Sequence, residues 1–319
     1  MIDALREALL IDPEWSTSGS RGLTWWPHRL EQRLEERDGL LSVETDALAF
    51  DGEPGAEVLS RLASLMRFPA LSGLVLEAGR VSLRSAIRIE PEVARVLVPL
   101  AAVSAAVQAS YAEMGVASLV ELTGGRAPFS AHPQSGARPQ ADDMLHLLTH
   151  EILPAGEALS RWEPPAERLQ AVEALMDDGF TAEATPEGLS ARFPGEGGIS
   201  LLQVRQREKH PELGSGVFVR LYLPVPASSP LSTPRTALWL NGREGEEGPA
   251  QFSLGSFCLE QSEPEIETFS VRPGPPRLAH VTFVPNYVFT RGLLAELCRD
   301  AGERAEWALH SLSHADPLV

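Results

Sequence analysis

Two histidines come nearest, by type and spacing, to a metal site in this chain. His146 and His150 stand in the stretch HLLTHE, with Glu151 after the second. On a helix this spacing would place both imidazoles on one face, where they could bind zinc. In zinc hydrolases, however, the glutamate follows the first histidine, and here that position holds Leu147. The pattern favours two solvent-facing histidines without a bound metal, and a zinc hydrolase using His146 and His150 is the weaker alternative.

No other pattern in the sequence indicates catalysis or a cofactor. There is no Gly-x-Ser-x-Gly elbow, and the stretches TGGRAPFS and GEGG lack the lysine and hydroxyl residue of a phosphate-binding loop. The histidines that show no local arrangement with serine or cysteine typical of a triad are His28, His132, His210 and His280. We therefore expect a protein that is not an enzyme and holds no cofactor.

The composition is that of an acidic globular protein. The 319 residues are 43% hydrophobic and 22% charged, which is typical of a folded, soluble chain. The net charge of -17 argues against nucleic acid or an anionic membrane as partner, because both attract clustered lysine and arginine. The N-terminus does not resemble a signal peptide, and no long apolar run occurs. We expect a cytoplasmic protein whose two cysteines, Cys258 and Cys298, are buried free thiols.

Helices and strands are expected in the same order in both halves of the chain. In the first half, a helix at 2–10 precedes strands at 29–34 and 40–48 with a turn at Asp38-Gly39, a helix at 56–68, a hairpin turning at Ala78-Gly79 and a helix from Pro91. In the second half, a helix at 166–178 precedes a hairpin at 180–193, strands at 199–208 and 216–225, a short helix opened by Thr233-Pro234, two paired strands and a last helix near 287–310. The stretch NGREGEEG, residues 241–248, reads as an acidic, solvated loop.

The repeated order predicts a tandem duplication. Placing Pro91 on Pro285, an offset of 285 − 91 = 194, aligns Ile87 with Val281 at matching strand–proline–helix junctions. Such junctions can also recur by chance, so the prediction rests mainly on the element order. The first copy is expected to be shortened at its start.

The quoted second-half motifs are HPELGSGVFVRLYLPV, WLNGREGEEGPAQFSLGSFCLE and HVTFVPNYVFTRGLL. With the order α–β–β–β–α–β–β–α, they resemble type III secretion chaperones and the YbjN-like proteins, over residues 166–310 and more faintly 24–113. The resemblance implies two chaperone-like α+β units, each an antiparallel sheet with flanking helices. Members of this group commonly pair two units across a two-fold interface, and they hold polypeptides without catalysis. The tandem copies are therefore expected to form a pseudo-two-fold, pseudo-dimeric monomer, since the linkage raises their effective concentration.

Three segments are expected. Residues 1–114 form the N-terminal chaperone-like unit, residues 115–165 a linker or insert with one amphipathic helix, and residues 166–319 the C-terminal unit. The linker is rich in Gly, Pro and Ser, and its helix is expected in ADDMLHLLTHEIL.

The leading functional hypothesis is a chaperone- or adaptor-like module that binds an unidentified protein partner on an exposed helix or sheet face. Trp25 and Trp26 are the candidate partner-binding residues, because adjacent strand residues point to opposite faces and aromatic anchors are enriched at interfaces. A contact between the two domains would explain them equally well. The alternative is a small-ligand-sensing regulatory protein with a pocket between the copies, to which Arg33, Arg205 and Arg207 would converge.

Overall fold

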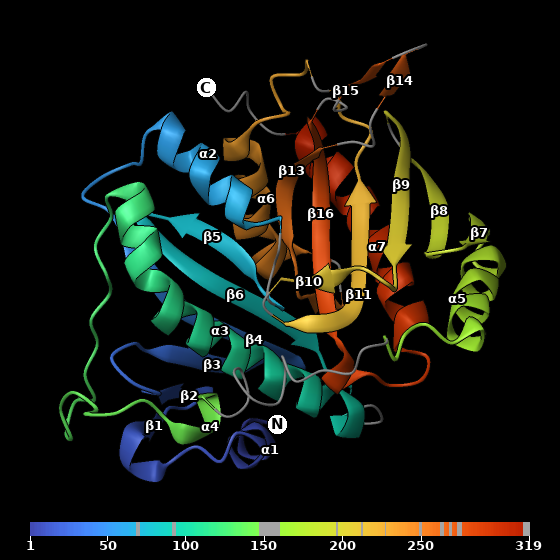
Figure 1. Cartoon of the computed structure of the whole chain (residues 1–319). Coiled ribbons are helices and arrows are strands. Elements are labelled where there is room, and N and C mark those ends of the chain that lie inside the picture. The colour runs from blue at the N-terminus through green and yellow to red at the C-terminus, as the bar shows by residue number, and fades with distance from the viewer. Residues whose placement is uncertain are drawn as a thin grey trace.

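The protein is a mixed α+β structure with two antiparallel sheets. The computed structural model (Figure 1) describes residues 1–67, 71–90, 94–146, 160–195, 197–211, 213–226, 228–248, 251–261, 265–267, 270–272 and 276–314. These residues form seven α-helices, two seven-stranded sheets and one two-stranded sheet. The α+β class, with antiparallel sheets and flanking helices, is confirmed. None of the described helices is both long and apolar enough to span a membrane.

The first half builds the first sheet. Its elements are α1 (Ile2–Ala8), η1 (Pro13–Trp15), β1 (Ser16–Ser18), β2 (Gly22–Trp25), β3 (Gln32–Arg37), β4 (Leu40–Ala49), α2 (Ala56–Leu65), β5 (Gly73–Glu77), β6 (Arg80–Arg88), α3 (Ala94–Thr123) and α4 (Asp143–His146). The strands lie in the order β1-β2-β3-β4-β6, with β5 on the far side of β6. The expected tight turns are confirmed, because Asp38-Gly39 and Ala78-Gly79 all have positive φ, as type I′ hairpins require.

The second half builds the second sheet. Its elements are α5 (Pro165–Asp177), β7 (Thr181–Thr185), β8 (Gly188–Gly195), β9 (Gly198–Arg205), β10 (Lys209–His210), β11 (Gly214–Tyr222), α6 (Pro234–Glu247), β12 (Phe252–Ser253), β13 (Ser256–Gln261), β14 (Glu265–Glu267), β15 (Ser270–Arg272), β16 (Pro276–Pro285), η3 (Asn286–Val288) and α7 (Leu293–Ser313). The sheet order is β7-β8-β9-β11-β16-β13, with β10 against β11, and β14 pairs with β15 separately. The two sheets therefore have the same strand order, with β1-β2-β3-β4-β6-β5 corresponding to β7-β8-β9-β11-β16-β13.

The residue alignment at the two prolines does not hold in space. Ile87 shares a sheet face with Ser85, whose hydroxyl bonds to α3. Val281 lies beside His280, which faces Arg304 of α7, so Val281 points away from that helix. A shift of one residue exchanges the faces of a strand. The offset of 194 therefore pairs a residue on the face covered by α3 with one that points away from α7.

Helix α3 lies across one face of the first sheet and is fixed there by buried polar side chains. Gln32 of β3 donates to the Thr45 hydroxyl of β4 at 2.8 Å, and Gln108 of α3 donates to the Ser85 hydroxyl at 2.6 Å. Ser85 also bonds to Ser104 of α3 at 2.8 Å. All five side chains are at most 1% exposed. Because buried polar groups are costly when unpaired, these bonds select one position of α3 on the sheet.

One strand segment serves both sheets. Phe252 and Ser253 of β12 pair with Ile87 and Ala86 of β6 in the first sheet, and β13 then pairs with β16 in the second. Helix α6 also contacts both sheets, since it packs against β5 as well as against β13, and α2 packs against β13. In Figure 1, α6 accordingly lies between β5 and β13. The two halves share one hydrophobic core.

The expected linker belongs in large part to the first half. Helix α3 continues to Thr123, so the expected boundary at residue 114 falls inside a helix. The chain then returns along the first sheet, where Arg126 bridges Ala49 and the Asp142 amide bonds to the Pro27 carbonyl. Of the expected amphipathic helix, α4 is described and residues 147–159 lie outside the described residues. Helix α5 begins at Pro165, close to the expected start of the second unit.

The prediction of a solvated loop at residues 241–248 is wrong. Helix α6 starts at Thr233, whose hydroxyl caps the Thr236 amide, and it continues to Glu247. Asn241 and Glu244 are buried, although glycines and acids surround them in the sequence. Asn241 bonds to both the amide and the carbonyl of Phe257 in β13. These tertiary partners offset the poor helix propensity of the stretch.

Candidate functional site

A groove lies between α7 and the end of the β8–β9 hairpin. It has a volume of about 950 Å³ and is lined on its apolar side by Phe180, Phe193, Trp307 and Leu309. The Phe180 and Phe193 rings meet edge to face with centroids 4.8 Å apart. The groove therefore has a packed aromatic floor along one side of α7.

Two glycines keep the helix and hairpin close together beside the groove. A Cβ at Gly302 of α7 would lie 3.2 Å from the Phe193 ring, and one at Gly195 of β8 would lie 3.3 Å from Leu309. Glycine inside a helix costs about 1 kcal/mol relative to alanine, so its presence here reflects the close approach. Gly302 is the sequence signal that could have drawn attention to this helix face.

The rim of the groove is acidic. Its one arginine, Arg299, is held by Asp178 at 2.8 Å and by Glu296 at 3.1 Å. Glu303 and Glu306, one turn further along α7, are exposed and make no ion pair with any described residue. Burial raises the pKa of Glu303, and the nearby negative charges of Asp300 and Glu306 raise it further.

A hydroxyl in the groove lacks a partner. Ser200 of β9 lines the groove and is 0% exposed, and its Oγ has no hydrogen-bond partner among the described residues. A buried hydroxyl without a partner costs roughly 1–3 kcal/mol. A ligand with a polar group at that point could satisfy it.

Beneath α7 a buried ion cluster joins the last helix to the strand shared by the sheets. Arg304 Nε lies 2.5 Å from Glu244 of α6, and Arg304 Nη1 lies 2.8 Å from Asp300. Asp300 in turn accepts the Phe252 amide of β12 at 3.1 Å. Burial raises the pKa of both carboxyls, and Arg304 opposes that change. The cluster is structural, because its members are at most 5% exposed.

His280 of β16 completes this cluster as a neutral ring. Burial lowers its pKa well below the ordinary value, and the charge of Arg304 lowers it further. Its Nε2 lies 3.6 Å from Glu244 and makes no hydrogen bond with a described residue. The ring also packs edge to face on Phe257, 4.9 Å away.

Acid should destabilise the protein through His280. Below about pH 6.5 the unfolded chain protonates this histidine while the folded chain does not, so stability falls as the pH falls. The expected slope is at most about 1.4 kcal/mol per pH unit for one group. Urea unfolding between pH 7 and pH 5 should show this slope in the wild type and a smaller slope in His280→Phe. Equal slopes would mean that the pKa of His280 is the same in the folded and in the unfolded chain.

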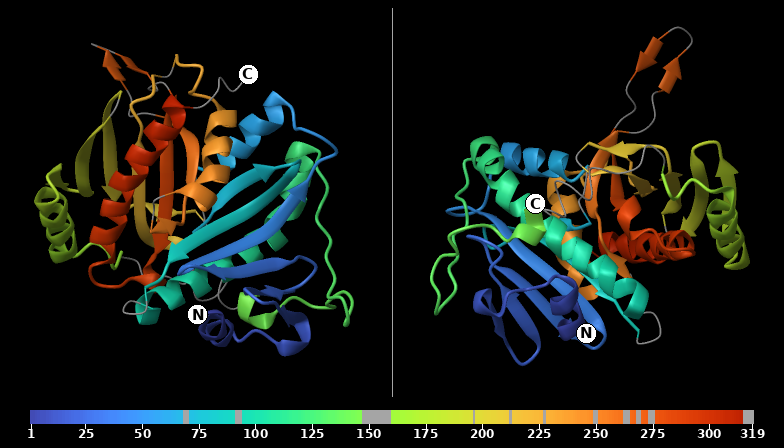
Figure 2. Two further views of the ribbon diagram at one scale, coloured as in Figure 1. Left: turned by 180° about the vertical axis from the view of Figure 1, so that it is seen from behind. Right: turned by 60° about the horizontal axis from the view of Figure 1, so that its bottom comes forward.

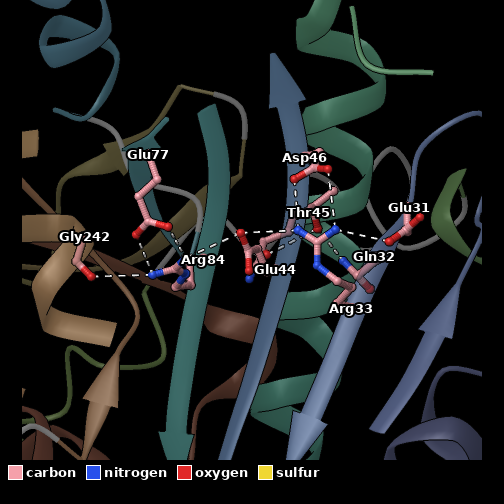
Figure 3. A network of polar contacts seen from close by, with 10 residues as sticks. Glu31, Gln32, Arg33, Glu44, Thr45, Asp46, Glu77, Arg84 and Gly242 are labelled. Carbon is pink, nitrogen blue, oxygen red and sulfur yellow. Dashed lines mark hydrogen bonds and ion pairs between the residues drawn. The ribbon is translucent and has the colours of Figure 1, made fainter. Parts of the chain in front are cut away.

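Arg33, one of the expected ligand-binding residues, is occupied by carboxylates on the face of the first sheet opposite α3 (Figure 3). Its guanidinium lies within 3.3 Å of three of them, those of Glu31, Glu44 and Asp46. Although burial lowers its pKa, these carboxylates raise it above the ordinary value. Arg84 continues the network from Glu44 to Glu77. Figure 2, seen from behind, shows this face of the sheet with α3 on the far side.

The other two expected arginines lie elsewhere. Arg205, at the end of β9, pairs with Glu187, and Arg207 lies 2.6 Å from Glu163. Both stand in the second sheet or just beyond it, whereas Arg33 stands in the first. The structure therefore does not bring the three arginines together.

A smaller cavity does lie between the halves. It has a volume of about 390 Å³ and is lined by Leu59 and Leu76 of the first half and by Leu238 and Trp239 of α6. Arg235 is the arginine that lines it, 3.9 Å from Glu53. Arg235 was not among the arginines expected in such a pocket.

Trp25 and Trp26, the expected partner-binding residues, are 1% and 4% exposed. Trp25 belongs to the hydrophobic core. Trp26 points to the opposite face, where the segment after α3 covers it: its Nε1 donates to Ser130 at 3.0 Å and its ring packs edge to face on His132. Both strand faces are thus covered at this point, and neither indole is available to a partner in this conformation.

The histidines of the weaker zinc alternative can be placed only in part. His146 ends α4 and its side chain is not described, while His150 lies outside the described residues. Among the described residues, no group of three His, Cys, Asp or Glu could hold a metal ion. Cys258 and Cys298 are buried free thiols, as expected, and burial raises the pKa of both, that of Cys298 to about 12.

Comparison with protein-family models, with curated proteins and with solved structures finds no match for this chain.

Proposed function

We propose that this protein is a non-enzymatic interaction module, built from two chaperone-like α+β units paired within one chain, that holds a polypeptide partner in the groove beside α7. The observation that carries the proposal is the common strand order of the two sheets combined with the contacts that α2 and α6 make with the outer strand of the other half. No catalytic step is required.

These contacts have the form of a self-complementary interface. Each half places its central helix against the outer strand of the other, α2 on β13 and α6 on β5, while α6 also packs on β13 of its own half. The two outer strands also meet, since the Leu74 amide donates to the Ser256 hydroxyl at 3.0 Å. In a two-fold interface the same surface is used on both sides. These features support the proposal of tandem copies. The copies would bury within one chain the surface that type III secretion chaperones and YbjN-like proteins use between subunits.

The groove remains open after this pairing and suits a polypeptide. Its wall on α7 runs from Arg299 to His310, about 16 Å of helix at 1.5 Å per residue. Its volume of about 950 Å³ is at the upper end for small-molecule pockets. An apolar floor with a charged rim is the arrangement that receives an amphipathic segment.

A capture experiment tests the proposal. Tagged wild-type protein should retain a stoichiometric polypeptide from native lysate, measured by native mass spectrometry. Leu309→Asp, which places a charge on the groove wall, should lose it. Leu122→Asp is the matched control, because Leu122 is an exposed leucine on α3 in the other half. Circular dichroism must show both variants folded. The proposal would be contradicted if the wild type captured no partner, or if Leu309→Asp retained the partner as well as the wild type does.

The second candidate function is a small-ligand-sensing regulatory protein. The cavity between the halves favours it, with leucines and Trp239 as apolar walls and Arg235 for an anionic group. The same native spectra distinguish the two functions. A bound small molecule that Arg235→Gln releases would support the sensor, and a bare chain would not.

A further inference from the structure

The charges on the groove beside α7 do not balance. Glu303 and Glu306 lie one turn apart on its rim without a cationic partner among the described residues. Arg299 is held between Asp178 and Glu296, so its charge is already matched. The remaining rim residue that can carry positive charge, His310, stacks near His314 with ring centroids 4.3 Å apart.

The groove differs in this respect from the face of the first sheet opposite α3. There Arg33 and Arg84 lie among the carboxylates and link them into one network (Figure 3). That face has polar side chains and internal ion pairs, whereas the groove has an aromatic floor, an unpartnered Ser200 hydroxyl and two unmatched acids. Of these two surfaces, the groove is therefore the one whose acids and hydroxyl lack partners among the described residues.

We infer that the partner of this groove is a basic, amphipathic polypeptide segment, whose apolar side chains cover Phe180 and Leu309 while its lysines or arginines pair with Glu303 and Glu306. The inference rests on the proposed function and specifies the partner's chemistry. Opposite charge on the rim of an apolar contact steers association and fixes orientation.

Three synthetic peptides of about 12 residues, roughly 18 Å long as helices, test the charge requirement. They share leucines at i, i+3, i+4 and i+7 and carry lysine, glutamine or glutamate at the other positions. Fluorescence anisotropy should show that the lysine peptide binds, that the glutamine peptide binds about tenfold more weakly, and that the glutamate peptide does not bind. Salt should weaken the lysine peptide most, because exposed charges are screened.

Variants of the protein locate the effect. Glu303→Lys with Glu306→Lys should weaken the lysine peptide at least about tenfold. Glu7→Lys with Glu121→Lys is the matched control, since it changes the net charge equally at exposed sites in the first half, and it should leave the affinity within about twofold. Equal losses in both pairs would show binding to the overall negative charge and would overturn the inference.

The outcomes separate this inference from the proposed function. If all three peptides bind equally and Leu309→Asp abolishes binding, the groove holds polypeptides without selecting charge, and only the inference falls. If none binds, both fall. If sedimentation of the protein alone shows a dimer that Glu303→Lys with Glu306→Lys disrupts, the occupant is a second copy and the inference is overturned.

Discussion

Replacing Arg304 with methionine is expected to lower the free energy of unfolding by about 3–5 kcal/mol. The substitution leaves Glu244 and Asp300 buried without their shared cation, and removing one partner of a buried ion pair costs more than the pair contributes. Asp300 also accepts the Phe252 amide, so the loss should reach β12 and the first sheet. Urea unfolding at pH 7 measures the change.

The control is Arg299→Met on the same helix. The side chain of Arg299, which pairs with Asp178 and Glu296, is 40% exposed. Exposed ion pairs of this kind contribute about 0–1 kcal/mol to the free energy of unfolding. The deficit of Arg304→Met should also shrink in acid. Burial raises the pKa of both carboxyls, so the folded variant takes up protons before the unfolded chain does and gains relative stability as the pH falls. A loss no larger than that of Arg299→Met would show that the cluster contributes little.

Gly255→Ala should be the second strongly destabilising change. Gly255 lies between β12 and β13, where the chain passes from one sheet to the other. A Cβ there would lie 2.7 Å from His280 Cε1 and closer still to the carbonyl oxygen of Val281, which is backbone and cannot turn away. We expect a loss of about 3 kcal/mol, at the upper end of overpacking effects. Thermal and urea unfolding measure it.

Gly115→Ala is the matched substitution with the opposite sign. Gly115 lies in α3, and a Cβ there would meet no atom within 4 Å. Alanine is favoured over glycine in a helix by about 1 kcal/mol, so this variant should be more stable than the wild type. If Gly255→Ala is as stable as the wild type, the crossing between the sheets is looser than the structure shows.

The local features of the fold could be read from the sequence because neighbours in the chain decide them. The hairpin turns at Asp38-Gly39 and Ala78-Gly79 need residues that accept positive φ, and Gly179 ends α5 for the same reason. The apolar spacing of α2 depends on its own residues. These features were expected correctly.

The features that depend on distant partners were not foreseen. The length of α6 depends on Glu244 meeting Arg304, 60 residues away in the chain. The faces of β6 and β16 are set by α3 and α7, so an alignment of prolines could not reveal which residues are equivalent. The expected convergence of Arg33, Arg205 and Arg207 was based on residue type alone, and each arginine instead pairs with a nearby carboxylate. The groove needs α5, β8, β9 and α7 together, and only Gly302 hinted at it.

Because residues 252–261 complete an edge of each sheet, neither half retains all its backbone partners alone. Separating the halves would leave the backbone groups of β12 and those of Ile87 and Ala86 in β6 without each other, and unpaired strand edges can pair with other chains. The molecule should therefore unfold as one cooperative unit, and the two halves produced as separate fragments should aggregate. The chain could not be divided into two independent subunits without first rebuilding that edge.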